Sequence, residues 1–241
     1  RFGNANSAYN FDGVNDFIQV TDHPTLNPTE KISINLWFKV ENNFGGNGNN
    51  TLVNKPFSSH DNPFYQYHIG ISGSQHFNKP STVLNDLSVQ NNWVKHNSNN
   101  NSYSLNNWYM LSLTYNGSVF KSFINGELFN QTIVTGNLDV YNQDLFIGKH
   151  GNLNSFTPVI IDDIAIYNRA LNGQEIQQLY SGENYSYAWS PTNETTSSIT
   201  VNPTENTTYT VSVTSGSTTC QESVNINVID CDNTGPKTFI P

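Results

Sequence analysis

The stretch WYMLSLTYNGSVFKSFINGELFNQTIV, residues 108–134, decides the fold class of this chain. Apolar and polar residues alternate along it, and two Asn-Gly pairs, Asn116–Gly117 and Asn125–Gly126, interrupt the alternation. A period of two predicts β-strands with one buried face. Asn-Gly between two such runs is the strongest short-range hairpin signal, because both residues accept the left-handed backbone of a tight turn. The stretch therefore predicts three antiparallel strands joined by two tight turns.

Further strands are predicted on both sides of this stretch. They cover residues 8–20 (strand, tight turn, strand), 32–40, 51–57, 64–72, 145–149 and 158–168. Residues 73–107 are the least regular part and carry only a weak strand signal, at 87–89. Many short strands with polar turns between them predict an all-β chain.

The composition is poor in charge and rich in asparagine. Of the 241 residues 12% are charged, the formal net charge is -9, and 39 residues are asparagine. No basic patch is available to contact nucleic-acid phosphates or an anionic membrane surface. The apolar runs are only about five residues long, whereas a helix that crosses a bilayer needs about 20 apolar residues. We therefore expect no nucleic-acid partner and no membrane insertion.

One helix and a second unit follow the strands. Asn172-Gly-Gln-Glu175 has the form of a capping box, which predicts a helix over residues 173–180 that ends at Gly182. Beyond it, residues 185–229 contain no His, Lys, Arg or Phe. Period-two runs at 197–203, 207–214 and 222–229 predict a small β-sandwich-like unit. The predicted domains are residues 1–182 and 183–230, followed by a linker, 231–241, to a further domain.

The two cysteines, Cys220 and Cys231, flank the last predicted strand. A strand of that length holds its ends farther apart than the roughly 7 Å between Cα atoms that a disulfide permits. A bridge between the two cysteines needs a sharp bend, and otherwise a partner must come from outside this chain. The chain also begins at Arg1 without methionine, so we expect it to be a piece of a longer protein.

Several segments together resemble a known family. They are FDGVNDFIQV (11–20), ISINLWFKV (32–40), the stretch 108–134, LFIGK (145–149) and IDDIAIYNRALNGQEIQQLY (161–180). In this order they are similar to the laminin-G-like, concanavalin A-like jelly-roll domain of secreted Bacteroidetes multidomain proteins, over residues 1–181. The resemblance implies an antiparallel jelly-roll β-sandwich with one short helix, whose N-terminal strand is missing here.

The rest of the chain carries two further resemblances. YSYAWSP (185–191), NPTENTTYTVSVTSGSTTC (202–220) and ESVNINV (222–228) resemble a partial Ig-like or PKD-like repeat. In such repeats the equivalent of Cys220 often pairs with a cysteine on an early strand, which is missing here, so Cys220 is expected to be free. GPKTFIP (235–241) is similar to the lead-in to a type IX secretion C-terminal domain. The resemblance implies a secreted or cell-surface protein whose missing C-terminal domain meets the type IX secretion machinery.

The sequence favours a protein that is not an enzyme. Jelly-rolls of this shape include laminarinase-type glucanases, in which Glu-x-Asp-x-x-Glu on one strand supplies the two catalytic carboxylates. None of the eight Glu occurs in that arrangement. The chain also lacks GxSxG and HExxH, and its six His are scattered.

Asp12, Asp16 and Asp162 are the best candidates for ligands of a structural calcium ion. Calcium takes six to eight oxygen ligands, and a turn such as Asp12-Gly-Val-Asn-Asp16 offers several together. Alternation along residues 158–167 predicts that Asp162 shares a face with Ile160, Ile164 and Ile166, where a carboxylate needs a partner. The alternative is that Asp12 and Asp16 only set the turn and that Asp162 caps a loop.

A glycan site is predicted near Trp93. Sugar rings stack on aromatic side chains, and planar amides and carboxylates bond their hydroxyls. The Asn-rich loops between residues 55 and 107 hold the predicted ligand-binding residues, Trp93, Tyr103, His96 and Tyr65. Trp37, Trp108 and Trp189 follow strand patterns and are expected in cores. The alternative for Trp93 is an edge residue that covers the sheet.

Together these patterns predict a non-catalytic, secreted or cell-surface module that binds glycans, with calcium as a structural cofactor. Three alternatives remain open. The chain is a passive spacer, or it binds a protein through an exposed strand edge, or it is an orphan hydrolase.

Overall fold

The computed structural model describes residues 7–41, 50–57, 63–72, 82–98, 103–151, 153–182, 185–215 and 218–228. The chain divides into two compact units, Arg1–Ser181 (unit 1) and Gly182–Pro241 (unit 2). Strands in the described ranges pair antiparallel throughout. No helix in these ranges has the length and apolar character that crossing a membrane requires.

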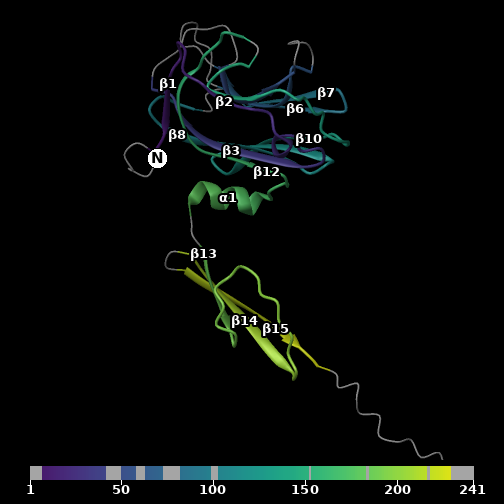
Figure 1. Cartoon of the computed structure of the whole chain (residues 1–241). Coiled ribbons are helices and arrows are strands. Elements are labelled where there is room, and N and C mark those ends of the chain that lie inside the picture. Colours follow the sequence, from purple (N-terminus) through teal and green to yellow (C-terminus); the bar gives the residue numbers. More distant parts are fainter. Residues whose placement is uncertain are drawn as a thin grey trace, which may run out of the picture. The chain divides into compact units, whose positions relative to one another are not determined.

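Unit 1 is a sandwich of two six-stranded sheets (Figure 1). Sheet A consists, in spatial order, of β1 (Tyr9–Asp12), β12 (Pro158–Tyr167), β3 (Ile32–Lys39), β8 (Trp108–Tyr115), β9 (Val119–Ile124) and β10 (Glu127–Ile133). Sheet B consists of β2 (Ile18–Val20), β11 (Leu145–Ile147), β4 (Asn50–Pro56), β5 (Tyr65–Ser72), β6 (Thr82–Val89) and β7 (Asn92–Asn97). A short 3₁₀ helix, η1 (Pro24–Leu26), follows β2. The predicted all-β, antiparallel jelly-roll sandwich is confirmed.

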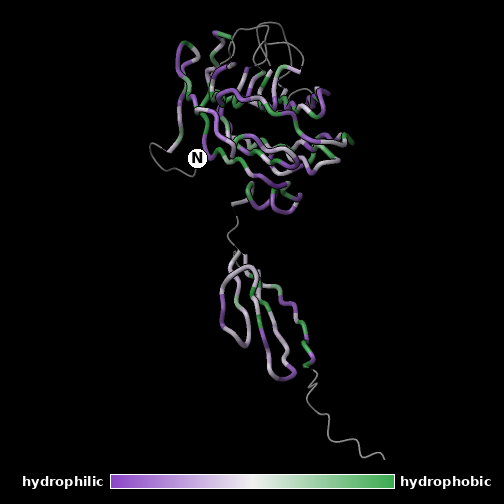
Figure 2. The backbone as a smooth tube through the Cα atoms, turned by 45° about the vertical axis from the view of Figure 1, so that its right-hand side comes forward, coloured by the Kyte–Doolittle hydropathy of each residue, from purple (hydrophilic) through white to green (hydrophobic). Residues whose placement is uncertain are grey.

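Alternating side chains build the core between the sheets. On β3, Ile32, Ile34, Leu36 and Phe38 are fully buried, as the period of two predicts. From sheet B, Tyr67, Ile69 and Leu87 are among the residues that complete the same apolar cluster. Figure 2 shows the resulting alternation of hydrophobic and hydrophilic residues along the sandwich strands.

Helix α1 (Gly173–Ser181) packs on the outer face of sheet A, below the sandwich in Figure 1. Its capping box is confirmed, because the Glu175 N–H donates to Asn172 Oδ1 over 3.0 Å and the Asn172 N–H donates to Glu175 Oε2 over 2.8 Å. Tyr180 stacks on Trp37 of β3, with ring centroids 5.6 Å apart. The helix therefore buries the second face of β3, and Gly182, at φ +65°, follows it.

Residues 82–97 differ from the prediction. The sequence predicts only a weak strand at 87–89, but β6 and β7 form a hairpin in sheet B. The two-residue turn between them, Gln90–Asn91, has positive φ at both residues, 49° and 62°. Gln-Asn is a weaker turn signal than Asn-Gly, which explains why the hairpin is hidden in the sequence.

The predicted face of Asp162 is right for Ile160 and wrong for Ile164 and Ile166, because a β-bulge interrupts β12 after Asp162. The register with β3 shifts between Asp162 and Ala165, and Asp163 has φ +49°. Before the bulge, Ile161 is buried in the core and Asp162 lies on the opposite face. After it, Ile164 and Ile166 pack against the core, so they do not share a face with Asp162.

Unit 2 has one three-stranded sheet in its described residues. The strands are β13 (Tyr185–Ser190), β14 (Thr207–Ser215) and β15 (Thr218–Ile226), in that order. The predicted strand at 197–203 is absent, and those residues form no ladder. The described part of unit 2 is therefore a single sheet rather than the predicted two-sheet sandwich. Cys220 is free and exposed on β15, and Cys231 lies outside the described residues.

Candidate functional site

The outer face of sheet B carries the candidate site. On β5, Tyr67 and Ile69 point into the core, so His68 between them points outward. The register sets a row of outward-facing side chains across β4, β5, β6 and β7, namely Asn54, His68, Asp86 and Lys95. Trp93, paired with Ser88, lies beside this row.

Trp93 lies on β7, the edge strand of sheet B, and its ring is half-buried. The ring of Phe64 meets it edge-on, with centroids 4.8 Å apart, and Lys95 Nζ lies 5.4 Å from its centroid. Within the described residues, Trp93 Nε1 is buried and makes no hydrogen bond. A buried indole N–H normally has an acceptor, and an ordered water would supply it here.

The β6–β7 turn positions Trp93. Asp139 Oδ2 accepts hydrogen bonds from the Asn91 N–H over 2.7 Å and from the Ser88 hydroxyl over 2.5 Å. These bonds tie the turn to the segment that precedes β11. Exposed Asn91 and Asn92 precede Trp93 directly in the chain.

Half-buried aromatic side chains extend the surface beside Trp93. The rings of Phe57 and Tyr141 lie 4.7 Å apart, and the Phe57 N–H donates to the Phe64 carbonyl over 2.7 Å. Desolvation by burial raises the pKa of Tyr141, so its hydroxyl stays protonated. We call Phe57, Phe64, Trp93 and Tyr141 the Trp93 cluster.

Tyr65, predicted as a ligand-binding residue, is buried next to the Trp93 cluster. Its ring stacks on His68, with centroids 4.4 Å apart, and its hydroxyl hydrogen-bonds His150 Nε2 over 2.7 Å. Burial raises the pKa of Tyr65 well above its usual range. Tyr65 therefore packs on His68 as a buried residue and offers little accessible surface to a ligand.

His68 also belongs to a hydroxyl–imidazole–carboxylate chain. Thr51 Oγ1 lies 3.3 Å from His68 Nε2, and Asp86 Oδ2 lies 2.9 Å from His68 Nδ1. This order of groups is the one that activates a nucleophile in hydrolases. Here all three side chains have at most 1% of their surface exposed, so a substrate cannot reach Thr51 in this structure.

His96, the third predicted ligand residue, points to the other side of β7. It is 1% exposed and stacks on Phe120 of sheet A, with centroids 4.0 Å apart. Its ring nitrogens lie 2.8 Å from Ser122 Oγ and 3.0 Å from Thr132 Oγ1. Desolvation by burial lowers the pKa of His96 to about 4, which keeps the ring neutral. The structure therefore makes His96 an interior residue and separates it from Trp93.

Tyr103, the fourth predicted residue, also lies in the core. It is 7% exposed and meets Phe38 edge-on, with centroids 5.5 Å apart. Its hydroxyl donates to the Ser72 carbonyl over 3.4 Å. Of the four predicted ligand residues, only Trp93 keeps a substantial surface on the outer face.

The predicted calcium ligands do not form one site. Asp12 Oδ1 accepts the Val14 and Asn15 N–H groups over 2.7 and 3.2 Å, and Asp16 Oδ2 accepts the Asp12 N–H over 3.2 Å. These backbone bonds, led by that from Val14, lower the pKa of Asp12. Both carboxylates are thus engaged in setting the β1–β2 turn.

Asp162 is remote from that turn along β12. Asp12 pairs with Pro158, four residues before Asp162, a separation of roughly 13 Å along a strand. Among the described residues no three His, Cys, Asp or Glu side chains are grouped to hold a metal. The carboxylates described here therefore do not fit a shared calcium ion.

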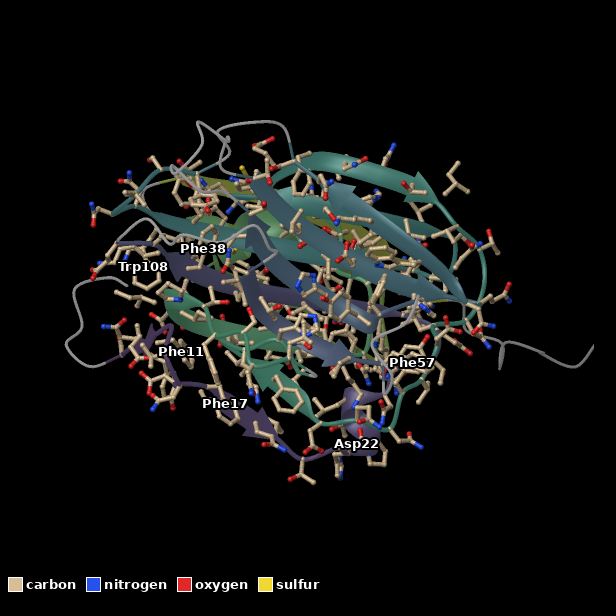
Figure 3. All side chains as sticks on the ribbon, turned by 90° about the horizontal axis from the view of Figure 1, so that it is seen from above. Phe11, Phe17, Asp22, Phe38, Phe57 and Trp108 are labelled. Carbon is tan, nitrogen blue, oxygen red and sulfur yellow. The ribbon has the colours of Figure 1, made fainter. Side chains whose placement is uncertain are left out.

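A second aromatic surface was not predicted from the sequence. Lys149 Nζ lies 4.5 Å from the ring centroid of Phe17 and 5.5 Å from those of Phe146 and Phe156. Phe17 is 39% exposed, and Figure 3 shows it far from Phe57. Phe17 is far from Phe146 and Phe156 in the sequence, and the pairing of β2 with β11 brings it to Phe146. An isolated antiparallel bridge between Lys149 and Phe156 adds the third ring.

The arrangement of these sheets matches a known family. A family model described as the concanavalin A-like lectin/glucanases superfamily matches residues 12–177. The chain belongs to this superfamily. None of the curated proteins matches the chain.

Solved structures with the superfamily's fold include several binding domains. The receptor binding domain of botulinum neurotoxin D is 18% identical, with a TM-score of 0.54, and the match covers 73% of this chain and 44% of the neurotoxin chain. The neurotoxin serotype D domain in complex with N-acetylneuraminic acid is 16% identical (TM-score 0.53; 76% and 48% covered). A heptameric SAP-like pentraxin from Limulus polyphemus is 10% identical (TM-score 0.50; 71% and 80% covered). The chain thus spans less than half of either neurotoxin domain, and these likenesses show the fold alone.

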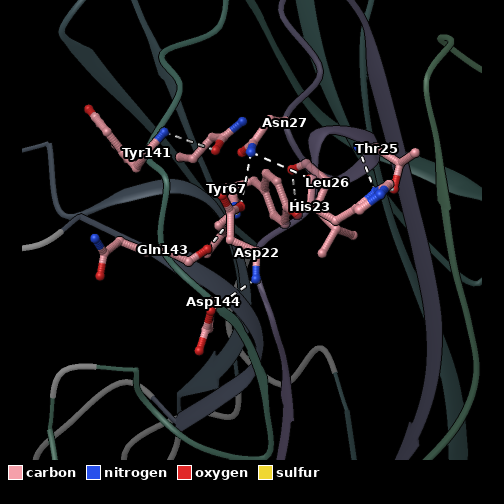
Figure 4. A network of polar contacts seen from close by, with 11 residues as sticks. Asp22, His23, Thr25, Leu26, Asn27, Tyr67, Tyr141, Gln143 and Asp144 are labelled. Carbon is pink, nitrogen blue, oxygen red and sulfur yellow. Dashed lines mark hydrogen bonds and ion pairs between the residues drawn. The ribbon is translucent and has the colours of Figure 1, made fainter.

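A buried lysine, Lys55, joins the polar network around Asp22 and Gln143, whose other members Figure 4 shows. Lys55 Nζ is fully buried and donates to Asp22 Oδ1 and to the Gln143 carbonyl, both over 2.5 Å. Asp22 also accepts from Asn27 Nδ2 over 2.9 Å, and its N–H donates to Asp144 Oδ1 over 2.9 Å. The hydrogen bond from Lys55 lowers the pKa of Asp22. The segments that contain Asp22 and Gln143 are therefore both fixed to β4, the strand that carries Lys55.

Proposed function

We propose that unit 1 is a non-catalytic module that binds glycans through Trp93 on the outer face of sheet B. The observation that carries the proposal is the half-buried indole ring of Trp93, which meets Phe64 edge-on and keeps part of its surface on the outer face. Apolar sugar faces stack on such rings.

Polar side chains around the ring match the remaining needs of a sugar. Exposed Asn97 lies on the same face of the edge strand as Trp93, and Lys95 places an ammonium group beside the ring. Amides donate to and accept from hydroxyls, whereas an ammonium group only donates. Because Lys95 is free to move in solvent, a sugar on the exposed ring face would displace its ammonium toward the rim of the ring.

The superfamily and its neighbours support a binding role. One neurotoxin neighbour is a ligand binding domain in complex with N-acetylneuraminic acid, and another is a receptor binding domain. Burial of Thr51, His68 and Asp86 supports a role without catalysis. We place the module outside the cell as part of a larger protein, with the type IX secretion machinery as a further partner and calcium as a further ligand to be tested.

A glycan array tests the proposal against a passive spacer. The chain is applied with calcium and again with EDTA, next to the Trp93→Ala variant. We expect a defined set of glycans to be retained by the wild-type chain and lost by the variant. An array without any signal in either buffer would refute glycan binding and favour the spacer. A signal that Trp93→Ala leaves unchanged would refute the site.

A further inference from the structure

The sheet edges of unit 1 are protected against added strands. An open edge offers unpaired backbone groups, and proteins protect such edges with short strands, bulges or lysines. In sheet B, β2 has only three residues, and β7 carries Lys95. In sheet A, β1 has four residues, and a bulge between Leu128 and Asn130 interrupts β10.

One edge of unit 2 is protected by the chain itself. The Trp189 N–H on β13 donates to the Glu194 carbonyl over 2.9 Å, and the Asn193 N–H donates to the Trp189 carbonyl over 2.7 Å. The indole Nε1 of Trp189 also donates to the Thr196 carbonyl, over 2.9 Å. The segment after β13 therefore folds back and occupies part of this edge.

The opposite edge of unit 2, β15, has none of these protections. It is nine residues long, contains neither Lys nor Pro, and pairs with β14 without a register shift. Eight of its nine residues are exposed. Among the described residues it pairs with β14 alone. It is the longest exposed strand edge in the described structure.

Side-chain bonds on one face keep β15 extended. Thr210 Oγ1 and Ser223 Oγ lie 2.8 Å apart, and Gln221 Nε2 donates to Ser212 Oγ over 2.9 Å. These cross-strand bonds satisfy the polar face of β15 with β14. The open edge is therefore preorganised to accept a strand, which lowers the entropy lost on binding.

Glu222 gives the edge a charge preference. It is the single charged residue of the three strands, and its cross-strand partner is Val211. Residues 185–228 contain three Glu and no Lys, Arg or His, so no cation of this sheet neutralises it. A strand added to β15 places one residue directly opposite Glu222, where an opposite charge stabilises and a like charge destabilises the pair.

We propose that the open edge of β15 is a docking site for an extended β-strand of another polypeptide, with Lys or Arg opposite Glu222. Backbone hydrogen bonds to the edge supply the affinity, as in other cases of β-strand addition, and the cation supplies the selectivity. Small apolar residues two positions on either side of the cation would face Cys220 and Val224.

A second copy of this chain fits the edge less well. When two copies pair antiparallel through β15 with the strand centres aligned, Glu222 of one copy lies opposite Glu222 of the other, and the like charges destabilise the pair. Registers that avoid this contact pair fewer residues. Each copy also brings a formal charge of -9. The wild-type chain is therefore expected to sediment as a monomer.

Two synthetic peptides test the proposal on the full chain under reducing conditions. Both have seven residues and alternate threonine with valine, except that the central valine is lysine in one peptide and glutamate in the other. Binding is followed by NMR titration and by hydrogen exchange of the β15 amides. We expect the lysine peptide to protect β15 and to bind about twofold to fivefold more tightly than the glutamate peptide.

A charge reversal supplies the decisive control. Glu222→Lys should invert the peptide preference, whereas Glu205→Lys makes the same charge change in the loop before β14 and should leave it unchanged. No peptide binding, protection outside β15, an unchanged preference in Glu222→Lys, or dimeric wild-type chain would each overturn the proposal. None of these readouts depends on glycan binding by unit 1.

Discussion

At the scale of single residues, strand alternation separates side chains that the sequence places side by side. Trp93 and His96 are three positions apart, so on one strand they face opposite sides of the sheet. Trp93 meets Phe64 on the outer face, and His96 meets Phe120 inside the sandwich. The prediction of one loop-borne site fails for His96 because β7 is a strand. It fails for Tyr65 and Tyr103 because both are buried.

His96 should make unit 1 sensitive to acid. Its pKa in the folded chain is about 4, below the usual 6.5. The buried neutral form is therefore fully accommodated above pH 6.5, and stability falls as the pH drops from 6.5 toward 4. The linked loss amounts to about 3 kcal/mol by pH 4.

Urea unfolding between pH 7 and 4 measures this loss in the wild-type chain and in His96→Gln. The variant is less stable at pH 7 because it loses the stack on Phe120, but its stability should fall less steeply with acid. Equal slopes for the two proteins would show that His96 does not titrate in this range.

At the scale of elements, the helix cap and the Asn-Gly turns could be predicted from the sequence, whereas features that depend on strand pairing could not. The capping box of α1 and the Asn-Gly hairpins involve neighbouring residues, and the structure confirms them. The β12 bulge at Asp163 and the gathering of Phe17 with Phe146 depend on strand pairing across the chain. Neither leaves a pattern in its own segment, which is why the sequence wrongly sets Ile164 and Ile166 on the face of Asp162 and misses the second aromatic surface.

The buried contacts of Lys55 join three segments and should contribute strongly to stability. Lys55→Met keeps most of the buried volume but leaves Asp22 and the Gln143 carbonyl without their donor. Removing the donor leaves Asp22 without its ion-pair partner, so we expect a lower melting temperature, moderated by the partial exposure of Asp22. Thermal melting measures it, with Lys31→Met at an exposed position as the control. Equal melting temperatures of the two variants would contradict a stabilising role of Lys55.

At the scale of the whole molecule, the two units differ in how much they bury. Unit 1 encloses an extended apolar cluster between its sheets. In the described part of unit 2, Tyr209 is the single apolar side chain that is buried. Since buried apolar surface is the main source of folding free energy, unit 2 has the smaller reserve of stability.

Native-state hydrogen exchange should show this difference along the full chain. Amides of β14 and β15 should exchange through openings of lower free energy than amides of β3 and β8, because local opening is easier where few apolar contacts hold a sheet. Equal protection of the two pairs of strands would contradict the assignment of unit 2 as the weaker unit.

The most direct test of the central claim is the affinity of Trp93→Ala for the glycan that the array retains best. Titration calorimetry compares it with the wild-type chain and with Phe17→Ala, which removes an exposed ring from the second aromatic surface. We predict at least a tenfold loss of affinity for Trp93→Ala, as for a central aromatic contact residue, and a change of less than about twofold for Phe17→Ala. Unchanged affinity in Trp93→Ala, or a large loss in Phe17→Ala, would contradict glycan binding on the Trp93 cluster.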